Sequence, residues 1–546
     1  MSGRDTAKRT DSDAGMWVEG EKEIQCHKDT TPPDHEHKSE LPELVSDVDP
    51  RDPLNWPLWL KASMDRTSQV VILVQTSILA ALGGLNTAAI NPAYGLLANE
   101  FGISKVRASY QTTVCIALNG AAPWLWIPLS NKYGRRPVYL ATTFLGFVSI
   151  LGCAYTQSFA QLIVARVFNG LFPVAFALGA ATITDLFFYE QRGRAMGFFT
   201  VLMTTGSHIA PIVGGLLGQY CGWRWIFKFV AIVDAFMLVV AFFCLPETLY
   251  IRPAMTSASR LSASEPIAEK APRPKFNKAI YFSSLRLYSH FPQLKLRLNQ
   301  FVLPALKMAK YPSVTFPALY YGTIYGFASI LPAVTVASIF TEFFHWNTLT
   351  IGLAYGGSLT IGSILGECVS GWVVDTIVIR ERRRLGHDPE PEIRLRAIWA
   401  GEVIVPAGLL IYGFCLQYHT AWIAPILGMG IACFGLQIIT TTTYTYATDC
   451  YRTESGEVAQ LFNFIRQEIG MTFAFYAVNL ANNIGYQWTF LMFALIGGGL
   501  AFIPMLLVII YGERWRKRLG QPVGVNAFDS MLEAGDQRNR SQRHNV

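Results

Sequence analysis

The stretch Asn131-Lys132-Tyr133-Gly134-Arg135-Arg136 lies between two apolar segments, near residues 109–130 and 137–156, that are each long enough to cross a bilayer. Gly134 suits a tight turn, and Arg135 and Arg136 place fixed positive charge at its surface. A second region, with Gly371, Asp375 and Arg380 to Arg384, carries similar residues later in the chain. This repetition of a basic loop between apolar segments predicts a duplicated membrane protein.

The composition of the whole chain supports the same interpretation. Of its 546 residues, 51% are hydrophobic and 15% charged, a balance that soluble proteins rarely show. About 20 apolar residues cross a hydrocarbon core of about 30 Å. The sequence supplies twelve such stretches, near 68–93, 109–130, 137–156, 159–187, 194–218, 223–245, 312–341, 349–379, 395–417, 421–449, 457–481 and 486–511. We expect an all-α integral membrane protein with twelve transmembrane helices.

The distribution of Lys and Arg predicts the orientation of these helices, because basic residues in short loops stay on the cytoplasmic side. Connections with basic residues alternate with the loops 3–4, 7–8, 9–10 and 11–12, which carry none, and this alternation with an even number of crossings places both termini in the cytoplasm. The net charge of +7 follows from this topology, so no nucleic-acid partner is expected. The plasma membrane is the expected location, and we expect the protein to function as a monomer.

A polar segment in the middle of the chain divides the helices into six and six. We expect a disordered cytoplasmic tail with an interfacial segment over 1–66, a six-helix bundle over 67–245 and a cytoplasmic linker over 246–311. A second six-helix bundle is expected over 312–511, followed by a cytoplasmic tail over 512–546.

Histidine and cysteine give no sign of an enzyme or of a metal site. Membrane desaturases and acyltransferases usually need clustered His or a His–Asp pair, and no two His lie three to five residues apart inside an apolar helix. The nine Cys are scattered without a Cys-x-x-Cys pair. We expect no catalytic residue, no bound metal and no cofactor.

Charged residues at the helix ends suggest a contact at the cytoplasmic mouth. Asp185 ends the fourth apolar stretch on the same surface as Arg135, and Arg192 follows in a similar loop. Topology alone requires neither Gly134 nor Asp185. We therefore expect an Arg135–Asp185 pair that clasps helices 2, 3 and 4, with Asp375 at the analogous place in the second half.

The fifth apolar stretch is rich in small residues. Gly206, Ala210 and Gly214 recur at four-residue spacing, and Pro211 removes one backbone hydrogen bond. Such spacing lets the backbone of a neighbouring helix approach closely. With Gly215, this pattern fits both a packing seam and a gate.

These motifs together resemble the major facilitator superfamily, and in particular its fungal drug:proton antiporters of twelve helices. The stretch from Ile127 to Pro137 is similar to the signature between helices 2 and 3, with Ile127 in place of a Gly and Asn131 in place of an Asp. Ala210-Pro211 with Gly214-Gly215 resembles the antiporter signature of helix 5. The resemblance also covers Arg166 with Gly170, Gly222 to Trp225, Pro246-Glu247-Thr248 and Pro391 to Leu395. It implies two pseudo-symmetric six-helix bundles that rock around a central site, driven by proton entry.

Ionisable groups inside apolar helices are costly and therefore candidates for function. Arg166 in helix 4 and Glu367 in helix 8 are the proton-site candidates, whereas the helices of Asp234 and Glu402 are supporting ones in the resembled fold. Helix 11 presents Asn463, Arg466 and Gln467 on one face. Aromatic and amide groups that suit flat organic molecules complete the expected cavity: Tyr325, Gln437 and Tyr444.

The sequence thus predicts a proton-coupled pump that exports a small lipophilic or amphipathic compound, such as a secondary metabolite or a drug, and so contributes to multidrug resistance. Two alternatives stay open. One is proton-coupled uptake of an organic cation such as a polyamine, which the buried acids would meet. The other is a membrane sensor that keeps the fold without transport.

Overall fold

The structure is a computed structural model that describes residues 69–172, 174–187, 189–249, 285, 299–386, 389–451 and 454–520. The predicted tail over 1–66, most of the linker over 246–311 and residues 521–546 lie outside the described residues. The described part of the chain is helical and contains no β-strand. The predicted all-α class is therefore confirmed.

The first six crossings form the N-terminal bundle. The first crossing is interrupted at Asn91-Pro92, where a short 3-10 turn replaces the α-helix because proline lacks a backbone N–H. The fourth is divided after Leu171. The elements of this bundle are α1 (Gln69–Ala88), η2 (Asn91–Ala93), α2 (Tyr94–Phe101), α3 (Lys105–Tyr133), α4 (Arg135–Ala154), α5 (Phe159–Leu171), α6 (Ala175–Leu186), α7 (Tyr189–Cys221) and α8 (Trp223–Cys244).

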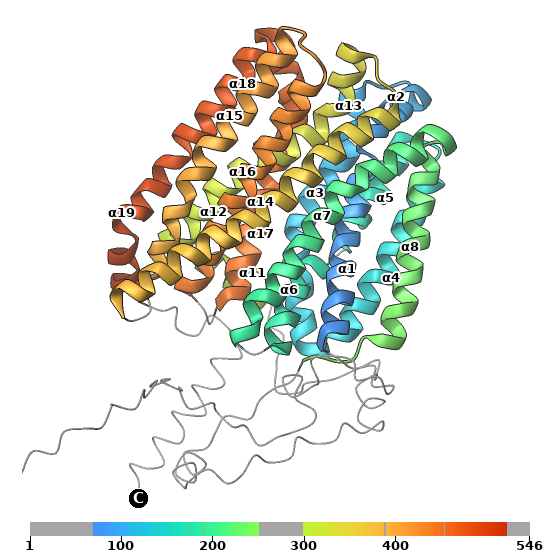
Figure 1. The fold of residues 1–546 in the computed structure, drawn as a ribbon. Helices are drawn as coiled ribbons and strands as arrows, with labels where there is room; N and C mark the ends of the chain where they lie inside the picture. The colour runs from blue at the N-terminus through green and yellow to red at the C-terminus, as the bar shows by residue number, and fades with distance from the viewer. Residues whose placement is uncertain are drawn as a thin grey trace, which may run out of the picture. The chain divides into compact units, whose positions relative to one another are not determined.

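The last six crossings form the C-terminal bundle, which Figure 1 shows in yellow to red. Two of them contain a five-residue π-helical segment, a rare form that occurs mostly as a local bulge. The elements are α12 (Pro312–Tyr325), η4 (Gly326–Ile330), α13 (Leu331–Phe344), α14 (Thr348–Leu385), η5 (Pro391–Ala397), α15 (Ile398–Gln417), α16 (Ile423–Cys450), α17 (Ser455–Ile484), α18 (Tyr486–Leu495), η7 (Ile496–Leu500) and α19 (Phe502–Leu519).

Eleven helical segments of the described chain are long and apolar enough to cross a membrane. The remaining long helix, α17, has 30 residues and is more polar because it carries Asn463, Arg466, Gln467 and Glu468. Its polar face lies against α3 and α12 instead of against lipid. The chain is a multi-pass membrane protein. Its polar helix α17 is the eleventh crossing, which the sequence predicted to line the cavity.

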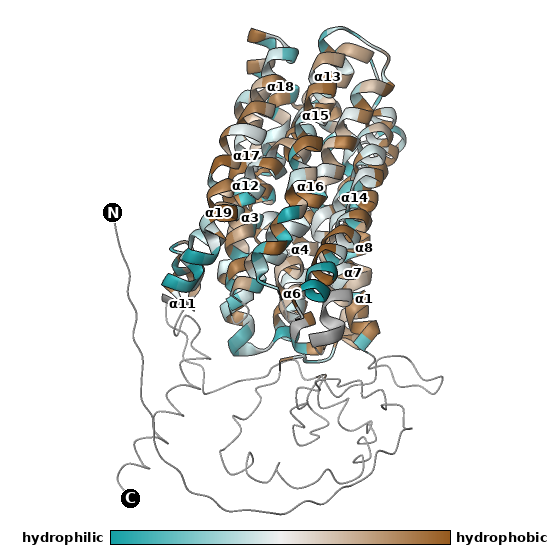
Figure 2. Ribbon diagram, turned by 60° about the vertical axis from the view of Figure 1, so that its left-hand side comes forward, coloured by the Kyte–Doolittle hydropathy of each residue, from teal (hydrophilic) through white to brown (hydrophobic). Residues whose placement is uncertain are grey.

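The two bundles meet most extensively along two helix pairs. Helix α7 packs against α14, and α3 packs against α17. Large apolar side chains such as Phe236, Trp372 and Leu500 are exposed on the outside, as expected of surfaces that face lipid tails. Figure 2 shows hydrophobic colouring along most of the helices and hydrophilic colouring near α6 and α11.

Helix α11 (Asn299–Met308) precedes the second bundle and packs against both α3 and α17. It buries Ala305 and Met308 while Leu303 and Leu306 stay exposed. The end of the molecule that holds α11, the α3–α4 turn and the last residues of α19 is called the basic end below (Figures 1 and 2).

Candidate functional site

The turn at Gly134 joins α3 directly to α4. Gly134 has φ +97° and serves as the C-cap of one helix and the N-cap of the next. Only glycine adopts this conformation without steric cost, since a Cβ would collide with the backbone. The tight turn expected from the sequence is present.

Arg135 follows this turn and forms the predicted ion pair. Its Nη2 lies 2.6 Å from Asp185 Oδ2, and its Nε donates to the same oxygen at 2.7 Å. The Arg135 side chain is 7% exposed and that of Asp185 is 26% exposed. We call this pair the N-terminal clasp; it ties the start of α4 to the end of α6.

Glu247, which follows α8, supports the clasp in a way that sequence reasoning missed. Its carboxylate accepts the backbone N–H groups of Arg135 at 2.9 Å and Arg136 at 3.3 Å. These are orphan donors at the start of α4, where the helix dipole also favours an anion. Burial raises the pKa of Glu247, and these hydrogen bonds and the charge of Arg135 oppose that rise.

Arg136 is nearly fully buried and binds backbone carbonyls. Its guanidinium donates to Leu245 O at 2.7 Å and to Phe242 O at 2.6 Å, near the end of α8. Unlike Arg135, it secures the last helix of the bundle to the turn. The sequence signal for Glu247, which binds the backbone of the same turn, is Pro246-Glu247-Thr248, a motif of the family resemblance.

Two other residues that the sequence placed at the cytoplasmic mouth lie apart from the Arg135–Asp185 pair. Asn131 is exposed in the last turn of α3, and its side chain makes no hydrogen bond within the described residues. Arg192 does not lie in a loop, because α7 already begins at Tyr189. The side chain of Arg192 is outside what the structure describes.

The second copy of the clasp is not at Gly371 and Asp375. Helix α14 continues without interruption to Leu385, so Gly371 lies inside the helix. Asp375 is exposed and forms no ion pair within the described chain. The prediction of a loop there is wrong because a run of charged residues can extend a helix beyond the bilayer as readily as it can end one.

The C-terminal bundle nevertheless has a clasp, formed by Arg394 and Asp449. The Nε and Nη2 atoms of Arg394, in η5, each lie 2.8 Å from Asp449 Oδ2, near the end of α16. Their side chains are 23% and 26% exposed. This C-terminal clasp joins the start of the ninth crossing to the end of the tenth, as the N-terminal clasp joins the third to the fourth.

Helix α7 carries the predicted seam of small residues. A Cβ at Gly214 would lie 1.6 Å from Ala89 O, and one at Gly206 would lie 2.7 Å from Ala81 Cα. Both positions therefore let α1 approach at backbone contact. Ala210 lies between them on the same face and is fully buried, and Pro211 lies inside the helix.

The opposite face of α7 packs against α14 of the other bundle. A Cβ at Gly215 would lie 3.0 Å from Gly352 Cα. Two turns earlier in α7, His208 Nδ1 lies 2.5 Å from Ser363 Oγ, which makes a buried polar contact between the bundles. Sequence reasoning did not select His208, although a histidine inside an apolar stretch was the available signal.

Arg166 is fully buried, with no exposed surface, but it does not hold a carboxylate within the described residues. Its Nη1 donates to Asn86 O at 2.7 Å and to Asn169 Oδ1 at 2.8 Å, and its Nε donates to Gln111 Oε1. The guanidinium lies 5.0 Å from the centre of the Phe227 ring. Its acceptors are neutral oxygens from α1, α3 and α5.

Arg466 of α17 lies among aromatic and amide groups. Its Nη1 donates to Tyr321 Oη at 3.1 Å, its Nη2 donates to Asn463 Oδ1 at 3.0 Å, and the guanidinium lies 4.8 Å from the Tyr325 ring. Asn463 Nδ2 donates across the bundles to Asn119 O at 3.1 Å. The predicted polar face of helix 11 is therefore present, and it meets α12 and α3.

The other predicted cavity residues are spread over several contacts. Glu367 accepts from Thr441 Oγ1 at 3.4 Å between α14 and α16. Gln437 is buried opposite Gly366 at the same helix pair. Tyr444 packs edge-on against Phe462, and Gln467 is buried against Gly120 of α3. The structure brings Tyr325, Asn463 and Arg466 together and places Glu367 and Gln437 at a separate helix pair.

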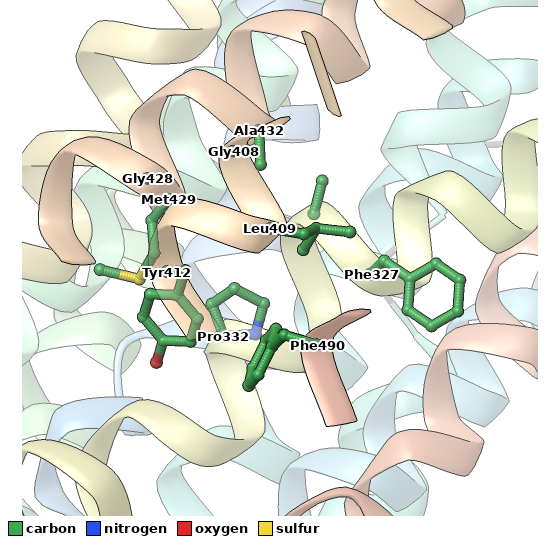
Figure 3. A pocket seen from close by; sticks show the side chains of 10 residues that line it. Phe327, Pro332, Gly408, Leu409, Tyr412, Gly428, Met429, Ala432 and Phe490 are labelled. Atoms are coloured by element: carbon green, nitrogen blue, oxygen red, sulfur yellow. The ribbon is translucent and has the colours of Figure 1, made fainter. Parts of the chain in front are cut away.

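Two cavities lie inside single bundles and not between them. The first, about 10 Å³ in volume, is apolar and lies in the C-terminal bundle (Figure 3). The second, about 20 Å³, lies in the N-terminal bundle and is lined by Asn86 and Asp234 among others. Neither approaches the several hundred Å³ of an organic-ligand site.

Two groups of six crossings, joined along helix pairs and carrying buried arginines inside apolar helices, define a polytopic membrane transport protein. The chain belongs to the Major Facilitator Superfamily, whose family model matches residues 76–475. The predicted family and fold are thereby confirmed.

Curated relatives span most of the chain. It is 28% identical to an uncharacterised transporter of Schizosaccharomyces pombe over 87% of this chain and 94% of the relative. It is 27% identical to the efflux pump radE of Floropilus chiversii, covering 86% and 83%, and 29% identical to the MFS transporter fsa7 of a Fusarium species, covering 86% and 87%.

One solved structure supports the fold. A bacterial homologue of the human lysosomal transporter Spinster, in an inward-facing and unoccupied conformation, aligns over 86% of this chain and 96% of that chain. The TM-score is 0.52 at 14% sequence identity, which supports a shared fold and nothing finer.

Proposed function

We propose that this transporter exports a small lipophilic or amphipathic organic compound, such as a secondary metabolite, in exchange for protons. The observation that carries the proposal is the surroundings of Arg466, where a cation lies among Tyr321, Tyr325 and Asn463 beside the contact between the bundles. Aromatic faces and hydrogen-bonding groups suit mixed-polarity molecules of varied shape. The efflux-pump relative supports the direction.

Arg466 also weighs against the alternative of organic-cation uptake. No acidic side chain among the described residues forms an ion pair with it, so a cationic cargo would meet an uncompensated positive charge. A cargo with acceptor oxygens or a carboxylate would find a partner there. Nothing in the geometry favours a sensor without transport.

The proposal also covers the location, the energy source and the functional unit of the transporter. The transporter lies in the plasma membrane, and its basic end and both termini face the cytoplasm. The energy comes from a proton gradient without a cofactor, no chemical reaction is catalysed, and a monomer suffices because each chain holds both bundles.

The test starts from the cell and ends in vesicles. Deleting the gene in the source organism and comparing small molecules inside and outside the cells by mass spectrometry identifies the retained compound. That compound is then followed in sealed vesicles that contain the purified full chain and an imposed pH gradient. We expect it to move against the proton flow. Movement with the protons, or no retained compound and no changed drug sensitivity, would overturn the proposal.

A further inference from the structure

Asp234 of α8 is a carboxyl group buried inside the N-terminal bundle. It is 3% exposed, and Asn86 Nδ2 of α1 donates to its Oδ2 at 3.1 Å. The sequence suggested a satisfied structural role for this residue. A single hydrogen bond from a neutral amide is little compensation for an ionised carboxylate in this position, because a buried anion requires a cation or several donors.

The carboxyl group opens onto the cavity of about 20 Å³ between the helices of the bundle. The lining comes from α1, α4, α6 and α8, which lie side by side in Figure 1, and from the residues between α5 and α6. Asp234 is the titratable residue of this lining, and the remaining polar groups are Asn86, Thr142 and Thr143. The volume is enough for one water molecule, which is the minimum for proton exchange.

The Asn86 side chain is shaped for a protonated partner. Asn86 is 5% exposed, and its Oδ1 is buried without a hydrogen-bond partner. A carboxylic acid complements a primary amide fully, since its O–H donates to the amide oxygen while its carbonyl accepts from the amide nitrogen. An ionised carboxylate has no O–H and leaves Asn86 Oδ1 unpaired, as the contacts now stand.

Arg166 connects this pair to a permanent charge. Its Nη1 donates to the backbone oxygen of Asn86, so one residue contacts both the acid and the cation. With Asp234 ionised the group is neutral overall, and with Asp234 protonated it carries one positive charge. The other charged groups of α4, α6 and α8 have partners of their own in the structure. Arg135 of α4 binds Asp185 of α6, Arg136 of α4 binds carbonyls near the end of α8, and Arg224 of α8 binds Glu100. Lys228 of α8 lies over the rings of Tyr155 and Trp225. Tyr139 of α4 bonds Thr182, and His208 of the neighbouring α7 bonds Ser363.

We propose that Asp234 is a proton-binding site of the transport cycle, with Asn86 as its positioning residue. A proton from the cavity water adds to the carboxylate, forms one O–H bond and leaves by the same bond when the site opens to the other side. The proposal rests on the proposed proton-coupled function. The transported proton then binds in the N-terminal bundle, whereas the sequence had favoured Glu367 of the C-terminal bundle as the proton site.

The packing of α1 shows how protonation of Asp234 would affect the contact between the bundles. Asn86 lies one turn before Ala89, whose carbonyl is pressed against Gly214 of α7. The other face of α7 contacts α14 at Gly215 and His208. A change in the Asn86 side chain and backbone contacts is therefore transmitted through rigid, closely packed helices to the interface.

The first test uses the proton alone as probe. Infrared difference spectra of the purified full chain in lipid are recorded as the pH is stepped, in the region of the carboxylic-acid C=O stretch. We expect a titrating band that Asp234→Asn removes, and that Asn86→Leu shifts in frequency without removing it. Glu402→Gln, which changes a buried acid bonded to Tyr320 in the other bundle, is the matched control and should leave this band in place.

Identical bands in the wild-type protein and Asp234→Asn would overturn the proposal. If Asp234→Asn fails to fold, the carboxylic-acid band of Asn86→Leu is the test. A shifted band supports the proposal, and an unshifted band overturns it. In vesicles with the retained compound, wild-type transport that follows the pH gradient and Asp234→Asn transport that ignores it support the site. Gradient-driven transport by Asp234→Asn overturns the site alone, whereas gradient-independent transport by the wild type overturns the proposed function.

Discussion

The two clasps at the basic end use the same chemistry on differently built scaffolds. In each, an arginine at the start of one crossing binds an aspartate near the end of the next, Arg135 with Asp185 and Arg394 with Asp449. The N-terminal arginine follows a one-residue turn at Gly134, whereas the C-terminal arginine follows the long extension of α14 and a 3-10 segment. The ion pair is thus the shared element, and the loop before it is not.

Burial and support also differ between the clasps. Arg135 is 7% exposed and Arg394 is 23% exposed. Glu247 binds the backbone of Arg135, whereas the acids near Arg394, Glu390 and Glu392, bind Arg516 of α19 instead. The N-terminal clasp is therefore fixed through both side chain and backbone, and we expect it to be the more costly to break.

Removing each arginine tests this difference most strongly. Arg135→Ala removes the cation that pairs with Asp185 and that also lies near Glu247. We expect the free energy of unfolding to fall by about 3 kcal/mol, as for a largely buried pair with one partner removed. Arg394→Ala should cost about 1 kcal/mol, since the pair is more exposed to solvent. The measurement is the thermal unfolding of both variants in the same detergent. Equal losses would show that burial does not distinguish the clasps.

Prediction from the sequence succeeded where local rules were sufficient. Gly134 and the charges around it predicted the turn, and four-residue spacing predicted a closely packed neighbour for α7, which the structure identifies as the first crossing. The partner of Arg166 and the end of α14 depend on neighbours distant in sequence. The C-terminal clasp had a signal that was overlooked, because Asp449 follows a Thr near the end of its helix as Asp185 does.

The glycines of the two halves offer a second, smaller contrast. Gly134 has φ +97°, so Gly134→Ala should destabilise the protein by about 1–3 kcal/mol through backbone strain. Gly371 lies in the middle of α14 with no atom near a new Cβ. Gly371→Ala should therefore be neutral or stabilise by about 0.5–1 kcal/mol through helix propensity. Opposite signs in thermal unfolding support the assignment, and a tolerated Gly134→Ala contradicts the turn.

The smallest effects are expected at Asn131, which stands where the resembled family has an Asp, and at Asp375, which was expected at the place analogous to Asp185. Both side chains are exposed, and Asp375 forms no ion pair within the described chain. Asn131→Asp and Asp375→Asn should each change stability by less than about 0.5 kcal/mol, as surface substitutions usually do. Transport of the retained compound should stay at the wild-type rate in both. If Asn131→Asp folds normally but abolishes transport, Asn131 must reach the N-terminal clasp in another state of the cycle, and the two clasps would then differ in their moving parts as well as in their burial.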